Sequence, residues 1–315
     1  MHCVVTGVAG FIGSTLAERL LAAGHTVRGI DCFIDYYPKA VKLKNLEISL
    51  AHKNFTFLDE NILAADLNRL LDGAEWVFHQ AAQAGVRASW GELFQTYTDN
   101  NILATQRMLE ACTRCKSLKK VVYASSSSVY GNAERYPTIE TDLPKPVSPY
   151  GVTKLAAEHL MCLYASEYHL PTTSLRYFTV YGPRQRPDMA FNKFIRAALK
   201  HEEITLYGDG EQSRDFTFID DIVEGNLLAA ARGAPGAVYN LGGGAVITVN
   251  EVLRLLEEIV GPIKVRRLES QRGDARHTGA ETAKARAELG FAPKVAVPEG
   301  LRREAQWMER LLASS

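Results

Sequence analysis

Short apolar runs alternate with helix-like patterns over the first 180 residues of the chain. The runs that we expect to form strands are His2–Thr6, His25–Ile30, Phe55–Leu58, Trp76–Phe78, Val121–Ala124 and Thr172–Arg176. After the first of them, Leu16, Leu20 and Leu21 are spaced like one face of a helix. Strands that alternate with helices favour a parallel, doubly wound α/β sheet.

Two longer helices are expected around Leu93–Cys115 and Tyr150–His169. Between them, the serine run Ser125–Ser128 directly follows an expected strand. In doubly wound folds, ligands bind beyond the carboxyl ends of the strands. We therefore expect these serines at an active site, where their hydroxyls can hydrogen-bond a substrate alcohol and relay its proton.

A glycine-rich turn joins the first expected strand to the first helix. Its glycines, Gly7, Gly10 and Gly13, would let the backbone turn tightly and approach a pyrophosphate, which the helix N-terminus then favours. Asp31 follows the second expected strand, eighteen residues after Gly13. A carboxylate there accepts hydrogen bonds from ribose hydroxyls and repels a 2′-phosphate. The pattern predicts a dinucleotide site that prefers NAD to NADP.

Tyr150 and Lys154 are four residues apart, so a helix would place both on one face. A free tyrosine titrates near pH ~10. A neighbouring ammonium can lower that pKa and favour the phenolate. The same spacing is common on solvated helices. The pair is interpreted as catalytic because the glycine turn predicts a dinucleotide site in the same chain. Together they predict an acid/base pair for hydride transfer.

Composition limits the classes of protein that fit. The 315 residues exceed one average domain, so we expect a cofactor domain and a smaller substrate region. Lys and Arg, 36 in all, balance 36 Asp and Glu, which leaves no basic field for nucleic acid or a membrane surface. No apolar run of ~18 residues occurs, and a strand is expected from residue 2, so we expect a cytoplasmic protein. The five cysteines are expected to be free, and no histidine spacing suggests a metal site.

Seven motifs carry a wider resemblance: Gly7–Gly13, Asp31, His79–Ala82, Ser125–Gly131, Ser148–Lys154, Arg176–Pro183 and Arg214–Asp220. Together they resemble the extended short-chain dehydrogenase/reductase family, specifically its nucleotide-sugar epimerases and dehydratases. The resemblance implies a Rossmann-type doubly wound parallel sheet with a smaller C-terminal α/β domain, and a homodimer packed through the two long helices. Residues 1–178 and about 216–242 would bind NAD, and about 179–215 and 243–315 would bind the nucleotide sugar.

Within that family, the segments Asp31–Tyr37, Ala81–Arg87 and Gly182–Ala190 are similar to enzymes that invert C4 of UDP-glucuronate. This implies that Tyr150 takes the proton of the 4-hydroxyl through Ser126 while NAD holds the C4 hydride, which interconverts UDP-glucuronate and UDP-galacturonate. Ser127 and Ser128 are alternatives to Ser126. They stand where dehydratases carry an Asp-Glu pair, and decarboxylases carry Glu at the position of Ser128. A UDP-glucose/UDP-galactose epimerase, a UDP-glucuronate decarboxylase and a non-catalytic NAD-binding protein remain alternatives.

The resemblance also implies binding roles. The residues expected to bind NAD are Gly7, Gly10, Phe11, Ile12, Gly13, Asp31, Asn61, Ile62, Ala81, Ala82, Asn101, Tyr150, Lys154 and Tyr177. Those expected to bind the UDP-sugar are Arg87, Ser126, Ser127, Ser128, Tyr150, Thr179, Arg186, Tyr207, Arg214 and Asp274. A guanidinium can bind a carboxylate bidentately, so Arg186 is the expected partner of the C5 carboxylate, with Arg87 as a second candidate. Asn61 stands where an Asp usually contacts adenine, and Asp59 is an alternative.

Overall fold

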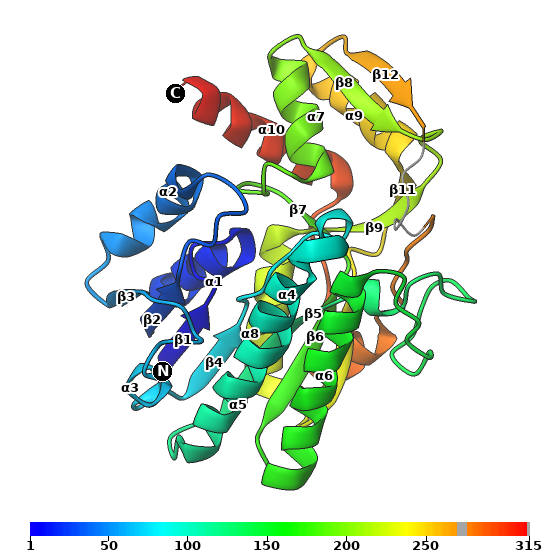
Figure 1. Ribbon diagram of the computed structural model, residues 1–315. Helices are drawn as coiled ribbons and strands as arrows, with labels where there is room; N and C mark the ends of the chain where they lie inside the picture. The colour runs from blue at the N-terminus through cyan, green and yellow to red at the C-terminus, as the bar shows by residue number, and fades with distance from the viewer. Residues whose placement is uncertain (270–275, 314–315) are drawn as a thin grey trace.

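The computed structural model describes residues 1–269 and 276–313. Its large sheet has seven strands, all parallel, in the order β10-β6-β5-β4-β1-β2-β3 (Figure 1). The bounds are β1 His2–Thr6, β2 Thr26–Asp31, β3 Phe55–Asp59, β4 Trp76–His79, β5 Lys120–Ser126, β6 Thr172–Tyr177 and β10 Ala237–Leu241. The six expected strands and the doubly wound sheet are confirmed.

Helices cover both faces of this sheet, because the strand side chains alternate between two apolar clusters. On β1, for example, Cys3 and Val5 belong to one cluster and Val4 to the other. The first cluster lies under α1 (Phe11–Ala22) and α8 (Ile219–Arg232), beside which α2 (Lys39–Leu50) packs. The second lies under α3 (Leu67–Leu71), α5 (Ala104–Arg114) and α6 (Pro149–Tyr168).

The helix expected around residues 93–115 is interrupted. The chain runs through a 3₁₀ turn at Gly91–Leu93, α4 at Phe94–Tyr97 and a π-helical segment at Thr98–Leu103 before α5 begins. Within the π segment, the Asn101 amide bonds both backbone groups of Gln83, accepting from N at 2.7 Å and donating to O at 3.1 Å. This contact between distant segments accompanies a wider turn that periodicity alone does not predict.

Helix α6 matches the expectation closely. The Ser148 hydroxyl caps it by accepting a hydrogen bond from the Gly151 N–H at 3.1 Å, and Pro149 occupies the first turn. The helix ends at His169, whose φ of 55° is left-handed. These signals fix the start of the helix one residue before Tyr150, so Tyr150 lies at its N-terminal end beside the end of β5.

A smaller region follows the sixth strand and lies at the upper end of the view in Figure 1. A three-stranded sheet contains β7 (Thr179–Tyr181), β9 (Ser213–Phe218) and β11 (Val246–Thr248). A two-stranded sheet pairs β8 (Glu203–Tyr207) with β12 (Lys264–Leu268). Helices α7 (Ala190–Leu199), α9 (Val249–Val260) and α10 (Val297–Ala313) pack against one another. Short 3₁₀ turns lie at Arg87–Ser89 and Ser127–Val129, and a second π-helical segment lies at Ala285–Leu289.

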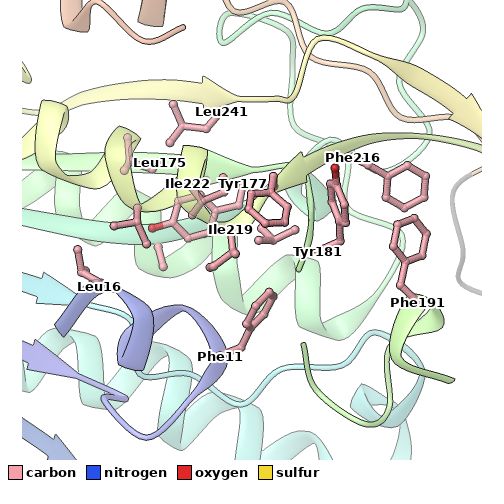
Figure 2. Close-up of a cluster of buried hydrophobic side chains, with 14 of the residues drawn as sticks. Phe11, Leu16, Leu175, Tyr177, Tyr181, Phe191, Phe216, Ile219, Ile222 and Leu241 are labelled. Carbon is pink, nitrogen blue, oxygen red and sulfur yellow. The ribbon is translucent and has the colours of Figure 1, made fainter. Parts of the chain in front are cut away.

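One apolar cluster joins the large sheet to the smaller region. Figure 2 shows it running from Phe11 and Leu16 of α1, past Ile219 of α8, to aromatic rings of the smaller region. There the Tyr181 ring packs edge-on against Phe191, with centroids 5.2 Å apart. This continuous core holds the segment after β7, which carries Arg186, in a fixed place relative to the glycine turn.

Candidate active site

A single cavity collects most of the residues expected to bind NAD. Its lining includes Gly7, Gly10, Phe11, Ile12, Gly13, Asp31, Asn61, Ile62, Ala81, Ala82, Tyr150, Lys154 and Tyr177. Arg186, expected on the substrate side, lines the same cavity. The structure therefore brings together the glycine turn, the Asp31 carboxylate that is expected to bind ribose, and the Tyr150–Lys154 pair. Asn101 does not line this cavity, because its amide bonds Gln83 and the Thr153 hydroxyl.

The glycine turn fits a diphosphate. Gly7 has a φ of 65°, and a Cβ there would lie 2.8 Å from the backbone N of Ala81. A Cβ at Gly13 would lie 2.2 Å from the Gly7 carbonyl oxygen, so the helix packs directly on the turn. Among the described residues no side chain caps α1, whose first residues line the cavity. Its first-turn N–H groups are thus available to an anion.

Asp31 ends β2 with its carboxylate held in place. Its Oδ2 accepts a hydrogen bond from Ala9 N at 3.0 Å and its Oδ1 from Phe33 N at 2.9 Å. Burial raises the pKa of Asp31, and these two N–H groups partly oppose that effect. Of the two adenine candidates, Asn61 lines the cavity, whereas Asp59 does not and lies 3.5 Å from the Lys39 ammonium.

Ser126 is the serine that bonds Tyr150. It ends β5, and its hydroxyl hydrogen-bonds the Tyr150 phenol and also accepts from Ser128 N at 3.1 Å. Ser125 instead donates to Glu158 Oε2 at 2.6 Å. Ser127 and Ser128 begin the short turn that follows. Of the three serines left open by the sequence, the geometry favours Ser126 as the proton relay.

The pKa shifts of Tyr150 and Lys154 differ from the expectation that the Lys154 ammonium lowers the pKa of the phenol. Burial raises the pKa of Tyr150, and the Ser126 hydrogen bond and the Arg186 charge lower it. Burial also lowers the pKa of Lys154 to about 7, with the Glu158 carboxylate opposing. The Lys154 Nζ lies 4.4 Å from the centroid of the Tyr123 ring. The Arg186 guanidinium thus favours the phenolate, but burial outweighs it and the pKa of Tyr150 stays above its ordinary value.

Of the other residues expected to bind the sugar, those that the structure describes lie outside the cavity lining. Arg87 and Tyr207 come together, with the guanidinium carbon 5.1 Å from the ring centroid. Arg214 Nη1 donates to the Ser213 carbonyl at 2.8 Å, and Thr179 begins β7. Asp274 lies outside the described residues.

Several residues of the site were missed by the sequence analysis. Gln80 lines the cavity and donates to the Tyr177 hydroxyl at 3.2 Å and to Asn226 Oδ1 at 3.0 Å. Glu158 lies one turn beyond Lys154 on α6 and is bonded by Ser125. The i+4 spacing from Lys154 could have identified Glu158. Gln80 carried no such signal, because both of its partners are distant in sequence.

No group of three or more His, Cys, Asp or Glu side chains within residues 1–269 and 276–313 could hold a metal ion. Over the same ranges, no helix is long and apolar enough to span a membrane. All five cysteines lie in these ranges and are free thiols.

Comparison with known proteins places the chain in a family. Residues 3–242 match the model of the NAD dependent epimerase/dehydratase family. The chain is 45% identical to the uncharacterized UDP-glucose epimerase YtcB of Bacillus subtilis (strain 168), with 99% of each chain covered. It is 38% identical to the UDP-glucuronate 4-epimerase of Thermodesulfobacterium geofontis (strain OPF15), covering 97% of this chain and 95% of the relative. The crystal structure of the Bacillus cereus UDP-glucuronic acid 4-epimerase with UDP-glucuronic acid and NAD superimposes with a TM-score of 0.95 at 43% identity, covering 99% and 100%.

Proposed function

The chain belongs to the NAD dependent epimerase/dehydratase family, and we propose that it interconverts UDP-glucuronate and UDP-galacturonate by inversion at C4. The observation that carries the proposal is one cavity that holds the NAD turn, the Tyr150–Lys154 pair and Arg186. Relatives that share 38% and 43% identity over nearly the whole chain act on or bind UDP-glucuronate. The enzyme is therefore an NAD-dependent nucleotide-sugar epimerase.

The residues of this chain supply binding and proton transfer. The first turn of α1 and Asp31 would hold the diphosphate and ribose of NAD, and bound NAD supplies a reversible hydride acceptor. The Tyr150 phenolate oxygen takes the proton of the 4-hydroxyl through Ser126, and the C4 hydrogen would leave as a hydride to bound NAD, so that a 4-keto sugar remains. After the keto sugar has turned its other face toward the bound cofactor, the hydride would return to C4 on that face and the same path returns the proton to the oxygen, so that C4 is inverted. No net oxidation results.

The pattern of side chains at the serine turn argues against elimination. Ser127 and Ser128 stand where dehydratases of the family carry acids, so no carboxylate at these positions can remove a proton for loss of water. A 4-keto uronic acid is a β-keto acid and loses CO₂ when its carboxylate bond aligns with the carbonyl. Arg186 would hold the plane of that carboxylate by bidentate hydrogen bonding. Inversion without decarboxylation is the expected outcome.

A neutral substrate is the second candidate. The 45% identical relative is named as a UDP-glucose epimerase, and the Tyr150–Ser126 machinery would serve either sugar. The two functions differ in whether a C5 carboxylate improves turnover. Because Arg186 lines the cavity, we favour the uronic acid.

A substrate panel tests the proposal. We expect purified enzyme to convert UDP-glucuronate to UDP-galacturonate, as seen by NMR of the products, and to act much more slowly on UDP-glucose. The Tyr150→Phe variant is the control and should lose at least about 10²-fold in turnover because its proton acceptor is gone. Faster turnover of UDP-glucose would favour the second candidate, and release of UDP-pentose would indicate a decarboxylase.

We also propose that two copies of the chain associate through α5 and α6. Apolar side chains are exposed on this side, among them Leu103 at 47%, Val152 at 47% and Leu163 at 51%. Val152 and Leu163 are eleven residues apart on α6 and so share a face. An exposed apolar face of this kind is typical of a protein interface. Location in the cytoplasm stays a prediction from the sequence.

A further inference from the structure

Arg186 has a carboxylate partner inside the chain. Its Nε donates to Asp188 Oδ1 at 2.9 Å, and its Nη2 donates to Oδ2 at 3.0 Å. This is the bidentate geometry that fixes the plane of a guanidinium. The side chains are 22% and 33% exposed, so the pair is only partly buried, and its Arg186 member lines the cavity. Asp188 thus determines how Arg186 meets the cavity.

Tyr36 supports this pair from the NAD side of the cavity. Its hydroxyl donates to Asp188 Oδ2 at 3.1 Å, and its ring centroid lies 5.8 Å from the Arg186 guanidinium carbon. Tyr36 lines the cavity and follows β2, while Asp188 is 152 residues further along the chain. The two segments therefore meet at Arg186, with one tyrosine contacting both members of the pair.

The ion pair with Asp188 leaves some N–H donors of the Arg186 guanidinium without a partner among the described residues. A guanidinium has five N–H donors, and Asp188 occupies the edge formed by Nε and Nη2. Within the described part of the chain, Nη1 makes no hydrogen bond, so the edge formed by Nη1 and Nη2 can take a second carboxylate. Arg186 and Tyr150 line the same cavity, and the Arg186 charge lowers the pKa of the Tyr150 phenol, so the guanidinium faces the reacting end of the cavity.

We propose that Asp188, supported by Tyr36, is a positioning residue that presents the open edge of Arg186 to the C5 carboxylate of a uronic acid. Asp188 would thereby set the preference for UDP-glucuronate over UDP-glucose. The inference rests on the proposed function. Its physical basis is preorganisation: an arginine whose plane is already fixed loses less conformational freedom when it binds an anion.

Binding selectivity tests this inference without depending on turnover. Dissociation constants for UDP-glucuronate and UDP-glucose would be measured by calorimetry on NAD-loaded protein in a shared Tyr150→Phe background. We expect Asp188→Asn to weaken UDP-glucuronate binding about ten-fold, the size of one lost charge-assisted hydrogen bond, and to leave UDP-glucose within about two-fold. Asp35→Asn is the matched control, because Asp35 is an exposed carboxylate next to Tyr36 and is not bonded to Arg186.

The measured selectivity distinguishes a positioning role of Asp188 from no role and from competition with the substrate. Unchanged selectivity in Asp188→Asn would overturn the inference, and tighter UDP-glucuronate binding would do so by showing that Asp188 competes with the substrate. If Asp188→Asn does not fold, Tyr36→Phe removes only the hydroxyl that steadies Asp188, and an unchanged preference there counts equally against the inference. Turnover of UDP-glucuronate by the wild-type enzyme is scored separately. Its absence would defeat the proposed function, while the selectivity ratio would still decide the role of Asp188.

Discussion

The ammonium group of Lys154 is almost completely buried. It is 2% exposed, and burial lowers its pKa from 10.5 to about 7. Between these two values the unfolded chain binds more protons at this residue than the folded chain does. The contribution of Lys154 to stability therefore rises with pH across that window and is least favourable below pH 7.

Replacing Lys154 with Met removes this buried charge. We compare the two proteins after NAD has been removed. The free energy of unfolding of the variant should exceed that of the wild type, and this excess should be largest below pH 7. The excess should shrink by up to ~1.4 kcal/mol per pH unit as the pH rises from about 7 to 10.5. Urea denaturation at several pH values measures it. A difference that does not vary with pH would show that the ammonium is not desolvated.

The strands β5 and β6 and the helix α6 share a buried ionic group beneath the serines. Arg176 of β6 donates from Nη2 to Glu158 Oε1 at 2.6 Å, and Ser125 of β5 donates to Glu158 Oε2 at 2.6 Å. Arg176 is 4% exposed and Glu158 is 3% exposed. Loss of one partner leaves the other charge buried and uncompensated. These contacts therefore hold β5, β6 and α6 together beneath the active site.

Arg176→Met tests how much this group stabilises the protein. We expect a loss of about 3–5 kcal/mol in the free energy of unfolding, because the Glu158 carboxylate would stay buried without its partner. Arg254→Met is the matched control: its partner Glu258 is four residues along α9, and the two side chains are 63% and 59% exposed. That change should cost less than ~1 kcal/mol. Similar losses in both variants would contradict the role of burial.

The elements that the sequence predicted best are those marked by local signals. Ser148 and Pro149 mark the start of α6, and the apolar runs mark the six strands. The strand β5 extends through Ser126, so two of the four serines belong to the strand and not to a loop. The π segment was missed because it accompanies the contact of Asn101 with Gln83, and no period of apolar residues records such a contact.

The candidate site shows the same division between local and distant contacts. The glycine turn and the Tyr-Lys pair are short motifs, so their chemistry could be read along the chain. Contacts within the smaller region, and between it and the large sheet, involve partners far apart in sequence. The Glu304 carboxylate accepts from Gly182 N at 2.8 Å, 122 residues away, and Arg184 pairs with Glu18 at 2.7 Å, 166 residues away. Only the three-dimensional structure reveals them.

Association of two copies predicts a sharp response to charge on α6. Leu163→Glu places a carboxylate in the proposed interface, so we expect the protein to sediment as a monomer at concentrations where the wild type is a dimer. Leu143→Glu is the control, since Leu143 is 73% exposed and lies outside both helices. Analytical ultracentrifugation measures the masses. A wild-type chain that sediments as a monomer, or a dimeric Leu163→Glu variant, would contradict the interface.

The most direct test of the proposed reaction follows the hydrogen on C4. UDP-glucuronate carrying deuterium at C4 would be incubated with the enzyme in ordinary water, and the product examined by NMR. If C4 is oxidised and reduced within one site, the product is UDP-galacturonate that keeps the deuterium at C4 and the carboxylate at C5. Loss of the C4 deuterium to water, or a product that lacks the carboxylate, would contradict the account.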